Sequence, residues 1–168
     1  MRSVVLHLLF GAGAALSACS DAPPAGPQDP HDRLGVWLPS SGVTFLHSPR
    51  SGLENPTLIV VSFPAAWQAL WSQAWGGASA APPLPEVDFV LSSVVVVGLG
   101  KRAGLGYFVT IDSIVTRTTG AVLYATESLP GANCQSAGIS APVHMVHAPG
   151  HPPVVEWRMS MLRRDCPP

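Results

Sequence analysis

The chain has few charged residues, no excess of positive charge and no long hydrophobic run beyond its first residues. Asp, Glu, Lys and Arg make up 11% of its 168 residues, and the formal net charge is −1 at pH 7. Because a basic surface is the usual electrostatic footprint of nucleic-acid binding, that function is not expected. After residue 18 no apolar run is long enough to predict a membrane-spanning helix.

Familiar catalytic motifs are also missing. There is no Gly-x-Ser-x-Gly sequence and no Cys-x-x-Cys pair. The acidic residues Glu86, Asp88, Asp112 and Glu127 are scattered, without a spacing that puts two of them on one element as an acid/base pair. Asp88 is better suited to accept hydrogen bonds from backbone N–H groups in a turn. We therefore expect no enzyme, although sites assembled from distant residues stay open, and we expect no cofactor.

The first residues resemble the signal peptide of a bacterial lipoprotein. Arg2 provides a positive charge, residues 4–16 form an apolar core, and Leu16-Ser17-Ala18-Cys19 resembles a lipobox. This predicts a signal peptide over residues 1–18 and acyl chains on Cys19 that anchor the mature protein in a membrane. Ser20 favours the outer membrane, on its periplasmic side or surface, over the inner membrane. The alternative is an ordinary secretory signal with a coincidental cysteine.

Residues 19–33 predict a tether between the membrane and the folded domain. They are rich in proline and lack apolar periodicity, with prolines at Pro23, Pro24, Pro27 and Pro30. Without Arg2 the mature chain has 8 basic and 10 acidic residues, a formal charge of −2.

The two cysteines after Cys19 are candidates for a disulfide. An oxidising envelope favours pairing of Cys134 with Cys166, which would fasten the C-terminus to the loop before Cys134. In the chain-entropy model a loop of this length contributes about 3–4 kcal/mol. Two free thiols or a redox pair are the alternatives, but no redox motif supports them.

The stretch from Pro85 to Ile111 has the strongest β signal. The β-branched run Val94–Val97 disfavours helix and suits a buried strand. Residues 98–106 combine glycines with Lys101 and Arg102, which predicts a tight turn with positive-φ positions. Residues 107–111 then predict a second strand. We interpret the whole as an antiparallel hairpin at the centre of the domain.

The segment between Ser62 and Gly77 is the only one with clear helical periodicity. Ser62 is a candidate N-cap, Pro64 fits a first helical turn, and Gly76-Gly77 would end the helix. Its apolar residues share one face: Trp67, Leu70, Trp71, Ala74 and Trp75. The tryptophans could form a ligand platform, but core packing is the commoner case. We expect this helix to pack across the sheet.

Further strands are predicted on both sides of the helix. In the last of them Val155, Trp157, Met159 and Met161 alternate with polar residues, which predicts a sheet buried on one face. The predicted strands span residues 36–38, 43–46, 57–61 (buried by composition), 121–127, 142–148 and 154–161. Together these elements predict an α+β domain over residues 34–168, a mainly antiparallel, sandwich-like β-sheet with one amphipathic helix packed on it.

Short segments follow one another in a specific order over roughly residues 50–157. They are Leu58-Ile59-Val60-Val61, Trp67-x-x-Leu70-Trp71, Pro85-x-Val87-Asp88-Phe89, Gly100-Lys101-Arg102-x-Gly104-x-Gly106-Tyr107, Pro130-Gly131-x-x-Cys134 and Ala141-Pro142-Val143-His144-x-Val146. This ordered set resembles the C-terminal domain family of the protease-complex subunit PrcB. It implies an exported protein or lipoprotein with a non-catalytic role in binding or stabilising another envelope protein, such as a protease. The chain departs from the family in two places. It has Gly104-Leu105-Gly106-Tyr107 where Thr-Gly-Gly-Tyr is usual, and Ala141-Pro142-Val143 where Ser-Pro-Tyr is common.

The glycine-rich turn is the candidate contact surface for such a partner. We assign partner binding to Lys101, Arg102, Gly104, Gly106 and Tyr107, together with the loop 133–143. The cations could dock an acidic partner, or they could simply be solvated. A phosphate-binding role is excluded because a strand, not a helix, follows the turn.

Three late histidines provide the alternative function, a metal or small-ligand site. These are His144, His147 and His151. On a strand His144 and His147 point to opposite faces, and no cysteine or carboxylate adjoins them as a further ligand. Incidental histidines are therefore favoured over a metal site.

Overall fold

The computed structural model describes residues 33–38, 43–76, 81–134 and 137–165. The predicted signal peptide, Cys19, nearly all of the predicted tether and Cys166 lie outside these residues. In the part of the chain that is described, no helix is long and apolar enough to cross a membrane.

The strands of the described residues form two four-stranded sheets and one two-stranded ribbon. Sheet A has the order β1-β6-β7-β10, sheet B has the order β2-β9-β4-β3, and β5 pairs with β8. The elements are β1 (Arg33–Trp37), β2 (Thr44–Ser48), β3 (Pro56–Val61), α1 (Pro64–Ala74), β4 (Ser92–Leu99), β5 (Arg102–Ala103), β6 (Phe108–Arg117), β7 (Gly120–Pro130), β8 (Ile139–Ser140), β9 (Val143–Pro149) and β10 (Val154–Arg164).

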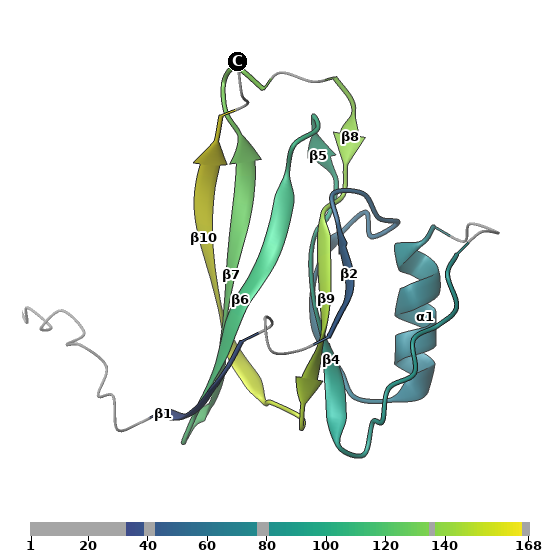
Figure 1. Cartoon of the computed structure of the whole chain (residues 1–168), viewed down its shortest axis with the longest axis vertical. Helices are drawn as coiled ribbons and strands as arrows, with labels where there is room; N and C mark the ends of the chain where they lie inside the picture. Colours follow the sequence, from purple (N-terminus) through teal and green to yellow (C-terminus); the bar gives the residue numbers. More distant parts are fainter. Residues whose placement is uncertain (1–32, 39–42, 77–80, 135–136, 166–168) are drawn as a thin grey trace, which may run out of the picture.

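The molecule has three layers, with sheet A on one side, sheet B in the middle and α1 on the far face of sheet B (Figure 1). One apolar core lies between the sheets and includes Val95, Ile111, Leu123 and Val146. A second core lies between sheet B and the helix, and its members include Trp67, Val94, Val96 and Met145. The predicted fold class, a β-rich α+β domain with one packed helix, is thereby confirmed.

Helix α1 forms where the sequence predicts it and buries the predicted face. The Trp67 indole donates to the Pro85 carbonyl at 2.9 Å, and the Trp71 indole donates to the Pro82 carbonyl at 3.1 Å. These two side chains are therefore core residues, as expected. The predicted cap was wrong, because Phe63 occupies the N-cap position and no side chain caps the helix.

The predicted hairpin between residues 94–97 and 107–111 was wrong. β4 lies in sheet B between β3 and β9, whereas β6 lies in sheet A between β1 and β7. Every residue of β4 is buried, because sheet A covers one of its faces and α1 the other. The glycine-rich stretch therefore carries the chain from one sheet to the other and does not close a hairpin.

Strand β3 forms within one residue of its predicted start but is not buried as predicted. It is an edge strand, paired with β4 on one side alone. Leu58 is 46% exposed and Ile59 is 41% exposed. An apolar composition predicts the strand, but its position at the edge of the sheet decides how much of it is covered.

Strand β10 differs from the prediction in its burial, and its direction was not predicted. It runs parallel to β7, an exception among pairings of described strands that are otherwise antiparallel. A register shift between Val154 and Glu156 turns Val154 and Trp157 towards the core. Val155 is 65% exposed and Met161 is 73% exposed, so the predicted apolar face is buried only in part.

Candidate functional site

The two halves of the predicted contact surface meet at one end of the sandwich. The connection from β4 to β6 contains β5, and the loop after β7 contains β8. These two strands pair, with Arg102 opposite Ser140 and Ala103 opposite Ile139. The Ser140 hydroxyl also donates to the Gly104 carbonyl at 2.9 Å. Segments far apart in the sequence are thus joined in one structure (Figure 1).

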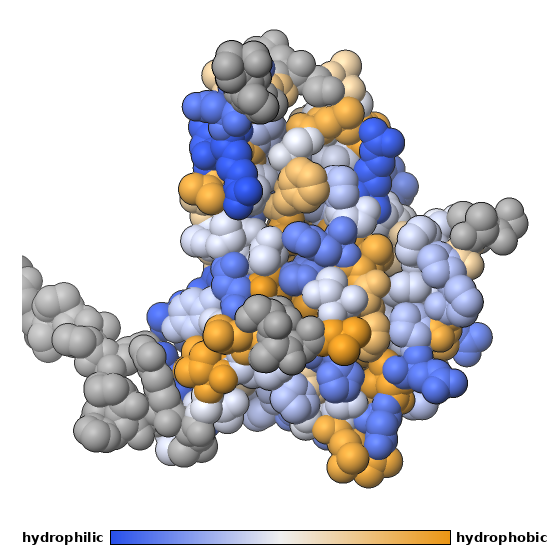
Figure 2. Space-filling model, in the orientation of Figure 1, coloured by the Kyte–Doolittle hydropathy of each residue, from blue (hydrophilic) through white to orange (hydrophobic). Residues whose placement is uncertain are grey.

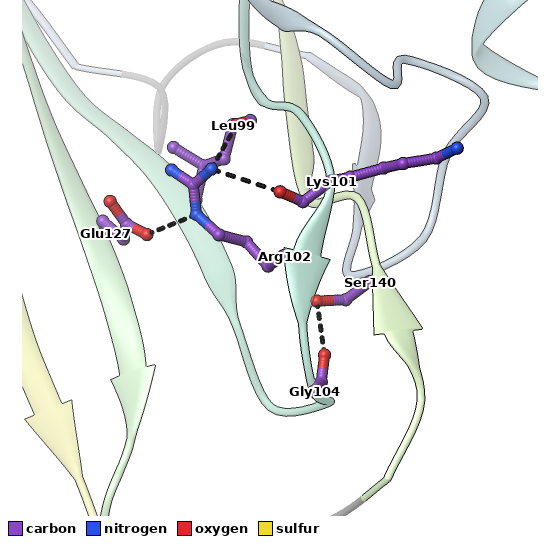
Figure 3. A network of polar contacts seen from close by, with 6 residues as sticks. All are labelled: Leu99, Lys101, Arg102, Gly104, Glu127 and Ser140. Atoms are coloured by element: carbon purple, nitrogen blue, oxygen red, sulfur yellow. Dashed lines mark hydrogen bonds and ion pairs between the residues drawn. The ribbon is translucent and has the colours of Figure 1, made fainter.

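Arg102 fastens this end of the molecule to both sheets (Figure 3). Its Nε donates to Glu127 Oε1 on β7 at 3.1 Å, and its Nη1 donates to the Leu99 carbonyl at the end of β4 at 2.7 Å. The Glu127 side chain is only 9% exposed. A buried carboxylate needs such a partner, because an unpaired buried charge costs several kcal/mol. Arg102 therefore acts as a structural clamp, and its charge is already balanced within the chain.

Lys101, unlike Arg102, makes its ion pair at an exposed position. Its Nζ lies 2.8 Å from Glu54 Oε1, but both side chains are more than half exposed, at 53% and 62%. Exposed ion pairs of this kind contribute about 0–1 kcal/mol, so the ammonium group can exchange this partner for another at little cost. In Figure 3 its side chain points away from the Arg102 network. Of the two predicted cations, Lys101 is the one available to a partner.

Three glycines shape the connection, as the sequence predicts. Gly100, Gly104 and Gly106 have φ angles of 70°, 106° and 90°. At Gly100 a Cβ would also lie 2.8 Å from the backbone nitrogen of Pro56. This position therefore excludes other residues both through its conformation and through the close approach of a neighbouring segment.

Two pockets adjoin each other at this end and share Pro130 and Cys134. The first, of about 400 Å³, lies across sheet A, and its lining includes Gly106 and Phe108. The second, of about 540 Å³, is lined in part by Gly104 and Tyr107. Figure 2 shows strongly hydrophilic groups on both sides of this end with more hydrophobic residues between them. Gly104, Gly106 and Tyr107 of the predicted contact surface thus line concave surface, as do Cys134 and Ala137 of its loop.

His144 lies at a seam between the two sheets. Its Nδ1 accepts the backbone N–H of Ile111 at 2.8 Å. Among the described residues β1 pairs with β6 from Ile114 onwards, and at Ile111 the imidazole accepts the backbone hydrogen bond. Because Nδ1 accepts a hydrogen bond, the ring is neutral and carries its hydrogen on Nε2. Burial, with a smaller contribution from His47, lowers the pKa of His144 to about 4.

His47 is a residue that the sequence did not single out. Its ring centroid lies 4.4 Å from that of His144, and its Nε2 lies 3.5 Å from Thr110 Oγ1. It also lines the first pocket. Only the pairing of β2 with β9 brings His47 opposite His144, and the spacing of the two residues in the sequence gives no signal of that pairing.

The late histidines do not come together. His144 shares the inter-sheet side of β9 with Val146, whereas His147 contacts Phe45, at 6.2 Å between ring centroids, on the helix side. The prediction that they face opposite sides of the strand is confirmed. Among the described residues, which include His151, no three His, Cys, Asp or Glu side chains lie close enough to hold a metal ion.

Three of the four acidic residues considered as catalytic candidates have other partners, and these are Asp88, Asp112 and Glu127. Asp88 Oδ1 accepts the Val90 backbone N–H at 2.9 Å, as predicted for a turn. Asp112 accepts a hydrogen bond from the Thr126 hydroxyl at 2.7 Å, and Glu127 pairs with Arg102.

Of the two cysteines in the predicted disulfide, Cys134 is among the described residues and Cys166 is not. Cys134 Sγ is 3.5 Å from the Arg164 carbonyl, and the Gly131 backbone N–H donates to the same carbonyl at 2.7 Å. Arg164 precedes Cys166 by two residues, so the pairing of Cys134 with Cys166 stays a prediction that this proximity supports.

Comparisons of the chain with models of protein families, with curated proteins and with solved structures found no match.

Proposed function

We propose that this chain is a lipid-anchored envelope protein whose sandwich domain binds another envelope protein without catalysing a reaction. An envelope protease is the first candidate partner, because the sequence resembles an accessory subunit of a protease complex. The lipobox-like residues 16–19 and the proline-rich segment 19–33 support the anchor and the tether.

One observation supports the assignment of the binding surface. The glycine-rich connection and the loop after β7 are joined through β5 and β8, and both contribute to the two adjoining pockets. A concave, mostly apolar surface with a few polar groups at its rim is the usual form of a binding site. The ion pair between Arg102 and Glu127 holds the connection in place before a partner arrives, which lowers the entropy cost of binding.

The residues of this surface then have different roles. Lys101 contacts an acidic group of the partner, and Tyr107 provides apolar contact with a polar tip. Arg102 contributes indirectly, by holding the connection in place. Reversing the charge of Arg102 would set two carboxylates against each other and disturb the fold, so Lys101 is the better residue for a binding test.

Site-specific photocrosslinking in intact cells tests the proposal. A photoreactive amino acid is placed at Lys101, at Tyr107 or, as a control, at Val90, which is 83% exposed in the turn before β4, at the opposite end of that strand from Lys101. We expect the same crosslinked product from positions 101 and 107 and none from position 90. The proposal is contradicted if neither position 101 nor position 107 gives a product, or if position 90 gives the same product equally well.

Charge reversal sharpens this experiment. Lys101→Glu should reduce crosslinking from position 107, because the partner then meets a carboxylate. Glu54→Lys is the matched control, since it changes the charge of the neighbouring residue but leaves Lys101 in place. Equal yields from both variants would remove Lys101 from the contact surface.

The membrane anchor has its own test. Cys19→Ser should release the protein from the membrane fraction and abolish the mass increase from acyl chains on the mature N-terminal peptide. A mature N-terminus other than Cys19 in the unaltered protein would refute the lipoprotein assignment.

A further inference from the structure

Strand β10 is the longest strand at any sheet edge of the described residues, and one of its sides has no strand neighbour there. It spans 11 residues, whereas the edge strands β1 and β2 have 5 each and β3 has 6. Short edges resist strand addition, but a long open edge offers a row of backbone donors and acceptors. Apolar side chains along this edge are also exposed, among them Met159 and Met161.

The direction of the backbone groups on β10 follows from one hydrogen bond. The Arg164 carbonyl accepts the Gly131 N–H, so the backbone groups of Arg164 point towards β7. Since direction alternates along a strand, those of Ser160 point the same way. The groups of Trp157, Met159, Met161 and Arg163 therefore point away from β7, towards the open edge.

The charges on β10 are arranged so that the strand complements itself. Glu156 lies near its beginning, and Arg163 and Arg164 lie at its end. In an antiparallel pair of two copies with Ser160 at the two-fold axis, Glu156 faces Arg164 of the second copy. Met159 then faces Met161, and Trp157 faces Arg163. Cross-strand pairs of opposite charge and of apolar groups stabilise such an interface.

Neighbouring registers lack this complementarity. An axis at Arg158 sets two arginines directly opposite each other, and an axis at Met161 sets Arg158 opposite Arg164. An axis at Met159 places Glu156 opposite Leu162 and leaves it without a basic partner across the strands. Like charges in opposing positions destabilise strand pairing, so the Ser160 register is the favoured one.

We propose that two copies of this chain associate through antiparallel pairing of their β10 strands about Ser160, which joins their A sheets into one continuous sheet. The interface is isologous, because each copy contributes the same strand and receives the same contacts. It does not use β5 or β8, and Arg164 is the one residue it shares with the described lining of the first pocket, so it can fail while the proposed binding function stands.

Cysteine crosslinking of the full chain purified in detergent tests the pairing. At the axis Ser160 would occupy a non-hydrogen-bonded pair, where Cα atoms lie about 4.5 Å apart, within the range of a disulfide. We expect Ser160→Cys to give a covalent dimer on mild oxidation. Leu162→Cys is the matched control, because its two copies would lie about 13 Å apart. The unaltered chain shows any crosslinking by natural cysteines.

Charge reversal gives an independent measurement by analytical ultracentrifugation. Glu156→Lys should weaken dimerisation roughly tenfold, because it places two pairs of like charges across the interface. Glu54→Lys makes the same change far from β10 and should have no effect. The proposal is overturned if the unaltered chain is monomeric, if it dimerises without a Ser160→Cys crosslink, or if Leu162→Cys crosslinks as readily.

Discussion

Sheet B and sheet A show how position in a fold changes the meaning of an apolar strand. β4, at the centre of sheet B, is buried along its whole length because sheet A covers one face and α1 covers the other. β10, at the edge of sheet A, is mostly exposed although it is also rich in apolar residues. The comparison shows that the burial of a strand depends mainly on the neighbours at its two faces and two edges, and less on its own composition.

Among the predicted substitutions, one in the helix layer should have the largest effect on stability. Trp67 is fully buried between α1 and sheet B and donates a hydrogen bond to Pro85. Trp67→Ala should lower the free energy of unfolding by about 3–5 kcal/mol, because it leaves a cavity and an unpaired carbonyl. Phe63→Ala, at the exposed start of the same helix, should change it by less than about 0.5 kcal/mol. Denaturant titration measures both, and similar losses would contradict the proposed difference in burial.

His144, at the seam between the sheets, should make the free energy of unfolding depend on pH. The folded protein holds the pKa of His144 at about 4, below the value of 6.5 expected in the unfolded chain. As the pH falls from 6.5 towards 4, the unfolded chain therefore takes up a proton that the folded chain excludes. This residue's contribution, fully present above pH 6.5, should decrease by roughly 3 kcal/mol across that window.

The matched variant is His144→Asn. Its amide oxygen can accept the Ile111 N–H but does not titrate, so the loss of stability between pH 6.5 and pH 4 should become smaller. An unchanged profile for His144→Asn would show that other groups control acid unfolding.

Replacing a valine with threonine on β4 and on β10 compares the two strands most directly, and it is expected to have the smallest effect on stability. Val95 on β4 lies in the core between the sheets, whereas Val155 on β10 is exposed. Val95→Thr should cost about 1–3 kcal/mol, because it buries a hydroxyl without an assured partner. Val155→Thr should change stability by less than about 0.5 kcal/mol. Equal effects in thermal or denaturant unfolding would mean that β10 is covered in solution.

Local patterns predicted much of what forms inside single elements. The periodicity of residues 67–75 located α1 and its buried face, and the turn role of Asp88 was predicted from its neighbours alone. The positive-φ glycines of the β4–β6 connection were also predicted. These features depend on contacts within a few residues, where backbone sterics and side-chain spacing are sufficient.

The candidate site was predicted only in part. The sequence singled out the residues from Lys101 to Tyr107 and the loop 133–143, but it treated both cations alike. Glu127 gives the two cations different roles. It lies 25 residues from Arg102 in the sequence and binds that residue, while Lys101 stays exposed. Such a distinction depends on which strand lies beneath the connection, and no short-range pattern contains that information.

By itself, the sequence determined the β-rich class, helix α1, most strand positions and the glycines of the connection. The tertiary structure alone decided that β4 and β6 belong to different sheets, that β10 runs parallel to β7, and that His47 meets His144. The physical reason is that strand formation follows local preference, whereas strand pairing follows the burial of whole faces and the satisfaction of backbone groups along every edge.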